Sequence, residues 1–486
     1  MYIRSTRQSG ALNILNAWLD PESTTLSLIF EVCRGAEYLG SLSLPASEFG
    51  LSDFDTMPAF GRWFQPGPKT LISWLQALLP KDETPVWLSF GTHPDPAGAE
   101  STSPRIGRTQ SRPSGYLAVL SWELNLVPAL GRPVLRMQGL PIRPLTQHRT
   151  LHLAICCSFS AAKQTEPPHD TLKRIFDQIP QFPQQSVTLH LFADLELQPF
   201  FATLQASLQS RSQVRIYPPT DAAKYGDAER ISSVPDTSDL QNPWLLWMRD
   251  SLAEVGVDAV QFVTHGYAAR GHGALAFAES PMHNEDRRWA RFVGTREISM
   301  LMDQLGAWSV LLTSSPDNYS VAGLRILHDE LTEFISGPVM LYEMRDDPAQ
   351  SDLRSAYEYV FGADATQPPA AGAISLYTHP DWKQPPDSDE EIPTQRWLGE
   401  FTLSGPLHDA FASANEVPAW LAAGQRTLER SVAKMTLAAE ETESGRAEQA
   451  GRQEALQFTA ELFARFARSE GISITPAGLT DAKEIV

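Results

Sequence analysis

From about residue 148 onward, short apolar runs alternate along the chain with segments whose apolar residues recur at helical spacing. The apolar runs predict strands, at 151–157, 187–192, 214–217, 259–263, 310–312, 338–341 and 373–377. The helical spacing predicts helices between most of them, at 170–179, 199–208, 243–255, 295–305 and 321–335. Strands that alternate with such helices predict a mainly parallel sheet covered on both faces. We therefore expect an α/β three-layer sandwich with its core at residues 148–405.

Residues 1–147 follow a different pattern, in which short apolar runs are separated by turns. Turn residues at 34–36 join two predicted strands as a hairpin. The predicted elements of this region are strands at 25–33, 37–45 and 85–90, a helix at 70–79, and a further strand that ends at Trp122. We expect a β-rich region that precedes the core and packs on it.

Residues 406–486 form a third region, in which apolar residues again recur at helical spacing. Leu421, Leu428 and Val432 belong to one such stripe and Leu456 and Phe463 to another. The pattern predicts a helical C-terminal extension, either a helical hairpin or one long bent helix. Its apolar stripe would pack on the sheet domain, dock a partner, or join two copies of the chain as an oligomer.

Composition narrows the possible functions. The 486 residues are 42% hydrophobic and 20% charged, which is typical of a globular protein with a substantial core. The formal net charge of -19 argues against a general nucleic-acid binder, because attraction to phosphate needs clustered Lys and Arg. No run of 18 uncharged apolar residues predicts a membrane span, and the first residues lack the apolar core of a signal peptide.

Cysteine usage and the short motifs add further expectations. The three cysteines (Cys33, Cys156 and Cys157) form a poor disulfide framework, and they offer no four-ligand zinc spacing. We expect a cytoplasmic protein without a bound metal. No P-loop or correctly placed GxGxxG occurs, so we expect no cofactor, and a nucleotide- or second-messenger-binding module is disfavoured.

Two predicted strands each deliver a polar residue at their carboxyl end, where open α/β sheets place their sites. His265 ends the first strand and could act as a general base near neutral pH. Gly266 would leave a backbone N–H unshielded, as an oxyanion hole requires. Alternatively, His265 is a structural histidine in a strand-to-loop turn.

The second strand ends at Ser314 and Ser315, where a nucleophile would stand. A serine usually needs a base that a third group orients, and the local sequence marks no such acid. Alternatively, these serines cap the next helix. Cys156 and Cys157 end the first strand of the core, so a relocated nucleophile there is a further possibility, although buried inert cysteines are common in such strands.

Together these segments resemble the CHAT-type members of the caspase-like cysteine peptidases, the group that includes caspases, separases and gingipains. The similarity covers about residues 20–380 and rests on the motifs VQFVTHG at 260–266, SVLLTSS at 309–315, LSWEL at 120–124 with LGRPVLR at 130–136, and LHLAIC at 151–156. The resemblance implies a caspase-like fold in which the strand at 151–156 neighbours the histidine strand. It also implies a His–Cys dyad, with His265 as the base and the nucleophile at the end of the next strand.

This chain departs from the family at the nucleophile. The position aligned with the cysteine is Ser315, with Ser314 as the one-residue alternative. The departure indicates either a natural pseudoenzyme or a Cys→Ser form of an active peptidase. We therefore expect one of two functions: an adaptor or regulatory effector in a bacterial signalling or defence complex, or an endopeptidase that cleaves a protein partner. In either case Cys157 and Glu279 are candidates for contacting the substrate or partner, and Glu279 would favour a basic side chain. Alternatively, Glu279 belongs to a solvated loop.

Overall fold

The computed structural model describes most of the first 380 residues of the chain. The described ranges are 12–20, 27–35, 37–49, 68–90, 117–138, 150–159, 168–179, 186–208, 212–225, 240–253, 255–269, 272–282, 290–314, 321–335, 337–349, 351–362, 367–380 and 382. The predicted C-terminal helices at 406–486 lie outside them, as does Ser315.

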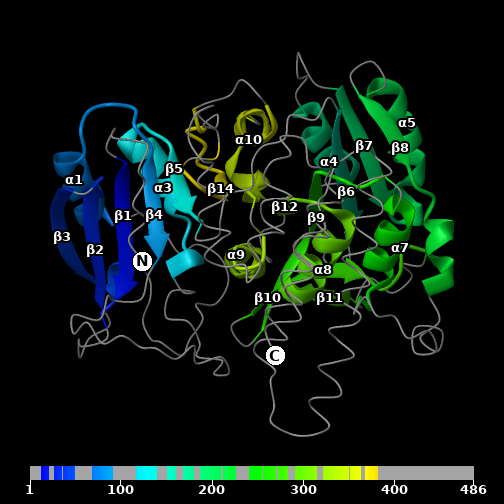
Figure 1. Ribbon diagram of the computed structural model, residues 1–486, viewed down its shortest axis with the longest axis horizontal. Coiled ribbons are helices and arrows are strands. Elements are labelled where there is room, and N and C mark those ends of the chain that lie inside the picture. Colours follow the sequence, from blue (N-terminus) through cyan, green and yellow to red (C-terminus); the bar gives the residue numbers. More distant parts are fainter. Residues whose placement is uncertain are drawn as a thin grey trace, which may run out of the picture.

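One continuous sheet of fourteen strands runs through the described part of the molecule (Figure 1). Its path is β3-β2-β1-β4-β5-β14-β13-β12-β9-β6-β7-β8, and β10 and β11 branch from β9. The bounds are β1 Asn13–Leu19, β2 Ser27–Arg34, β3 Glu37–Pro45, β4 Val86–Phe90, β5 Val134–Met137, β6 Thr150–Ser158, β7 Ser186–Ala193, β8 Gln213–Ile216, β9 Ala259–Ala269, β10 His272–Ala278, β11 Ala290–Gly294, β12 Ser309–Ser314, β13 Val339–Glu343 and β14 Ile374–Thr378.

The core half of this sheet is mostly parallel, as predicted. Strands β8, β7, β6, β9, β12 and β13 run parallel, and β14 is antiparallel to β13. Except in the edge strand β8, whose side chains are exposed or half-buried, the paired side chains are mostly buried on both faces, which explains why these strands are nearly continuous apolar runs in the sequence. The α/β class and the mixed, mostly parallel sheet are therefore confirmed.

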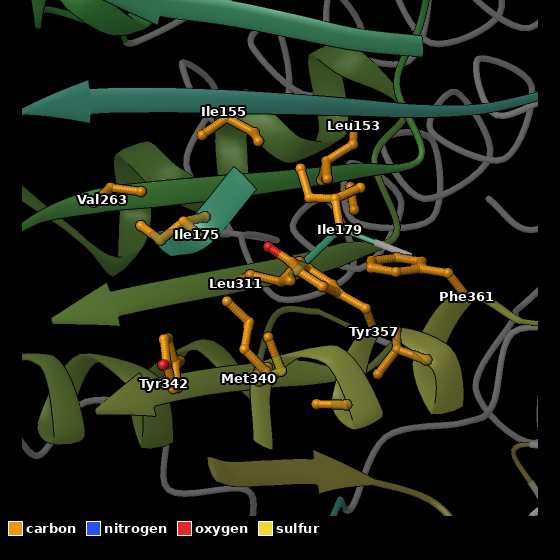
Figure 2. Packing of buried hydrophobic residues seen from close by; sticks show 14 of the residues in the cluster. Leu153, Ile155, Ile175, Ile179, Val263, Leu311, Met340, Tyr342, Tyr357 and Phe361 are labelled. Carbon is orange, nitrogen blue, oxygen red and sulfur yellow. The ribbon is translucent and has the colours of Figure 1, made fainter. Parts of the chain in front are cut away.

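Helices cover both faces of this half (Figure 1). The bounds are α4 Pro168–Asp177, α5 Gln198–Leu208 and α10 Asp352–Phe361 on one face, and α7 Pro243–Leu252, α8 Thr295–Leu305 and α9 Val321–Leu331 on the other. Each layer encloses its own apolar cluster, and Figure 2 shows part of the α4/α10 cluster, where Tyr357 meets Leu311 and Ile179. The arrangement is consistent with the predicted three-layer sandwich.

The N-terminal region extends the same sheet rather than forming a separate one. β5 pairs in parallel with both β4 and β14, so the strands before residue 138 continue directly from the core strands. The helices α1 (Lys69–Leu78) and α3 (Trp122–Leu130) pack on these strands around a third apolar cluster. The predicted hairpin is present, with Gly35 at φ 59° between β2 and β3.

The predicted strand ending at Trp122 is wrong. Trp122 instead begins the helix α3, and Leu117 and Ala118 before it are helical as well. Glu123 in the first turn suits the positive end of the helix dipole, and Gly131 ends the helix in the left-handed conformation at φ 64°. An apolar run of this length fits a strand or a buried helix equally well, and burial of Trp122, Leu126 and Val127 in the third cluster selects the helix.

Candidate active site

β9 is the central strand at the candidate site. It pairs in parallel with β6 on one side and with β12 on the other. Val263 of β9 is the Cα partner of both Cys157 in β6 and Thr313 in β12. The strand that carries His265 therefore lies between β6 and β12, and the carboxyl ends of all three strands meet at one edge of the sheet.

His265 lies where β9 leaves the main sheet. The last parallel pairs along β9 are Val263 with β12 and Thr264 with Ser158 of β6. The expectation that the strand ends at His265 is wrong, because β9 continues to Ala269 and pairs with β10 in an antiparallel hairpin, with His265 opposite Ala276 and Gly266 opposite Leu275. His265 is buried and Gly266 is half-buried.

The pleat of the strands separates His265 from Ser314. Val263, two residues before His265, packs in the cluster of α4 and α10, whereas Leu312, two residues before Ser314, packs in the cluster of α7, α8 and α9. Because side chains alternate along a strand, His265 and Ser314 project from opposite faces. The hydroxyl of Ser314 is buried and has no hydrogen-bond partner in the described part of the structure. This geometry disfavours Ser314 as the partner of His265.

Ser315 follows β12 directly in the sequence and lies outside the described residues. The structure therefore leaves its role as a prediction.

Both core cysteines are buried completely. Cys157 projects to the same face as Val263, and Cys156 projects to the other. Burial raises the pKa of each thiol well above its usual range, and the carboxylate of Asp194 adds to the effect. A protonated, inaccessible thiol is a poor nucleophile and offers no surface to a substrate. Neither cysteine suits the relocated nucleophile, and Cys157 is a core residue in this structure.

A buried polar chain connects α10 to the two site strands. The hydroxyl of Tyr357 donates to Oε1 of Gln261 at 2.5 Å, and Nε2 of Gln261 donates to the hydroxyl of Thr313 at 2.9 Å. Gln261 is on β9 and Thr313 is on β12, so these hydrogen bonds join the two strands on the face of the sheet from which His265 projects. Sequence reasoning missed this network. The signal was present as a glutamine within the apolar run at 259–263.

The helix that follows the predicted nucleophile position packs directly on the backbone of the hairpin. A Cβ on Gly323 of α9 would lie 2.4 Å from the carbonyl carbon of Tyr267, and a Cβ on Gly273 of β10 would lie 2.3 Å from the backbone N of Leu327. Only glycine allows such close contact of main chains. This contact fixes the direction in which β9 leaves the sheet after His265.

Two buried arginines anchor the segment that carries the LSWEL motif. Arg136 binds both carboxylate oxygens of Glu123 at 2.6 and 3.0 Å and donates to the carbonyls of Ala118 and Leu120. Arg325 of α9 forms an ion pair with Glu343 and donates to the carbonyl of Val119. The motifs LSWEL and LGRPVLR thus contact each other through Glu123 and Arg136, a pairing that sequence inspection did not foresee.

Glu279 follows β10 and is exposed. Its carbonyl accepts a hydrogen bond from Nε of Arg291 in β11, and Ala278 before it donates its backbone N–H to the hydroxyl of Ser158 at the end of β6. Glu279 is therefore beside the carboxyl end of β6 rather than beside Ala276, the partner of His265. Its predicted role in contacting a substrate stays a prediction.

Other kinds of site find no support in the described residues. They contain no group of three or more His, Cys, Asp or Glu placed to hold a metal ion. Among the helices described, none is long and apolar enough to cross a membrane. Comparison with known proteins adds no relative: no family model, no curated protein and no solved structure matches the chain.

Proposed function

We propose that this chain is a caspase-like protein of the CHAT type in which a degenerate peptidase site binds a protein partner. It would act as an adaptor or regulatory effector in a bacterial signalling or defence complex. The proposal depends mainly on one observation. His265 occupies the first position of β9 beyond its parallel pairing, on the strand that pairs with β12.

Register supports the assignment of Ser315 to the nucleophile position. Val263 and Thr313 are paired, and His265 and Ser315 each stand two positions beyond them in the sequence. Ser314 lacks this equivalence, since it is one position closer. In the resembled family the equivalent position holds a cysteine, and replacing a thiol by a hydroxyl removes a group that ionises readily beside a histidine.

The second candidate is an active endopeptidase with Ser315 as the nucleophile and His265 as the base. The same adjacency of β9 and β12 favours it. A serine is the weaker nucleophile, however, and usually requires a base that a third group orients. We therefore rank the binding function first.

Hydrolysis of a mixed fluorogenic peptide library distinguishes the two candidates. The proteins to compare are the natural chain, Ser315→Cys, and Ser315→Cys combined with His265→Ala. We expect the natural chain to be inert, Ser315→Cys to gain turnover, and the double variant to lose it. Turnover by the natural chain that disappears with His265→Ala would favour the endopeptidase instead. A Ser315→Cys chain whose turnover is independent of His265 would contradict both.

A further inference from the structure

An exposed aromatic pair lies on the hairpin that carries His265. The rings of Tyr267 in β9 and Phe292 in β11 have centroids 4.4 Å apart at an interplanar angle of 31°. Their side chains are 48% and 51% exposed, which is unusual for two large aromatic residues in contact.

Strand register places this pair on the same face as His265. His265, Ala276 and Phe292 are cross-strand neighbours in one row, and Tyr267 and Ala274 are neighbours in the next. The alternate residues of the hairpin point inward and belong to the α7/α8/α9 cluster: Leu275, Phe277 and Val293. The side chains of His265, Ala276, Phe292, Tyr267 and Ala274 therefore lie on the face of the hairpin opposite to that cluster, where Tyr267 and Phe292 are exposed and His265 and Ala276 are buried.

The surface between His265 and the two rings is made of small side chains. Ala276 and Ala274 occupy the middle strand of the hairpin, so no bulky side chain on that strand separates the histidine from the aromatic pair. We name this surface the aromatic shelf and define it as Tyr267, Ala274, Ala276 and Phe292. A segment of chain that reached His265 could lay a neighbouring side chain on this shelf.

We propose that the aromatic shelf is a subsite that takes an arginine or lysine side chain of the protein partner. The inference rests on the proposed function, and it adds the class of side chain that the site selects. Ring faces carry negative potential and attract a guanidinium or ammonium group, with arginine favoured because its planar group stacks. The net charge of -19 favours a basic partner.

The test uses the full-length chain and randomised nonapeptides with one fixed position, read by fluorescence anisotropy. The fixed residue is arginine, lysine, citrulline or leucine, where citrulline keeps the shape of arginine without its charge. We expect the peptides with a fixed arginine to bind best. Tyr267→Ala combined with Phe292→Ala should lower the affinity for these arginine peptides about tenfold, as loss of two cation–π contacts predicts. Tyr38→Ala is the matched control, because Tyr38 is 57% exposed on β3 at the far edge of the sheet.

Several results would overturn the subsite. A preference for leucine, equal binding of citrulline and arginine, or an arginine preference that survives the double substitution would each do so. Binding by none of the panels would also overturn it. Reactivity of Ser315→Cys toward a thiol reagent, measured in the same protein with and without His265→Ala, reports the proposed function separately. If the peptide results contradict the subsite but the thiol reactivity still depends on His265, only the subsite fails. If the thiol reactivity does not depend on His265 but arginine peptides still bind the shelf, only the proposed function fails.

Discussion

Arg136 and Glu123 form a bidentate ion pair that is completely enclosed by the protein. The pair joins β5 to the first turn of α3. The guanidinium carbon of Arg136 lies 5.4 Å from the centroid of the Tyr377 ring in β14. Because β5 is the strand that connects the N-terminal strands to the core strands, this ion pair stands at the junction of the two halves of the sheet.

Removing one partner of this pair should destabilise the protein strongly. Glu123→Gln leaves the Arg136 charge buried without its counterion, and we expect the free energy of unfolding in urea to fall by about 3–5 kcal/mol. Lys224→Gln is the control, because Lys224 meets Asp250 at 3.4 Å and 55% of its side chain is exposed, and exposed pairs contribute less than about 1 kcal/mol. Equal losses for the two variants would show that the buried pair has no special role.

The contact between α9 and the hairpin predicts a strong effect of a single methyl group. Gly323→Ala would place its Cβ within 2.5 Å of three backbone atoms of Tyr267, so either the helix or the hairpin must move. We expect the free energy of unfolding to fall by about 1–3 kcal/mol. Gly294→Ala should be nearly neutral, since a Cβ there meets nothing within 4 Å. Thermal unfolding measures both, and an equally mild effect of both variants would argue against the close packing.

The polar chain beneath the site predicts a cost for losing one hydroxyl. Tyr357→Phe leaves Oε1 of Gln261 buried without its donor, and we expect stability to fall by about 1–3 kcal/mol. Tyr38→Phe removes an exposed hydroxyl and should change little. Chemical denaturation of the two variants beside the natural chain gives the comparison. If the Tyr357→Phe chain is as stable as the Tyr38→Phe chain, the hydrogen bond from Tyr357 to Gln261 does not stabilise the fold.

The burial of His328 should make the stability of the protein depend on pH at values above those at which carboxylates titrate. Burial lowers its pKa to about 3, with the Arg136 charge as a smaller cause. The unfolded chain binds a proton near pH 6.5 and the folded chain does not, so stability falls as the pH decreases below that value, by up to about 1.4 kcal/mol per pH unit. His190, whose pKa burial also lowers to about 3, adds a similar term.

The contribution of His328 can be measured from slopes rather than from absolute stabilities. We expect His328→Gln to reduce the fall in unfolding free energy between pH 6.5 and 5, even if the substitution itself destabilises the protein. An unchanged slope in the variant would contradict the neutral, buried state of His328.

The sequence predicted the core half of the fold well, because most of its strands are buried on both faces and its helices are amphipathic. The predicted helix at 295–305 coincides with α8, and the strand at 310–312 lies within β12. Pattern alone could not place β5 against β14, since no local signal encodes which strands far apart in the sequence will pair. It also misassigned the run before Trp122, where tertiary packing decided between strand and helix.

The candidate site was predictable in part. The polar residues at the ends of two predicted strands indicated one shared sheet edge, and the resemblance implied that these strands belong to one site. The structure pairs the two strands, but it places the side chains of His265 and Ser314 on opposite faces of the sheet. The aromatic shelf was not predictable from local sequence. Tyr267 and Phe292 are far apart in the chain, and they meet only because β10 pairs with both β9 and β11.

Alkylation of a thiol at position 315 tests the central claim most directly, because it needs neither a substrate nor an activator. The protein to use is Ser315→Cys in a Cys33→Ser background, since Cys33 is only half-buried whereas Cys156 and Cys157 are fully buried. We predict that the introduced thiol reacts with iodoacetamide well below pH 8.5, the ordinary pKa of a cysteine, and that His265→Ala returns its pH profile to that value. An ordinary profile that is the same with and without His265→Ala would contradict the account.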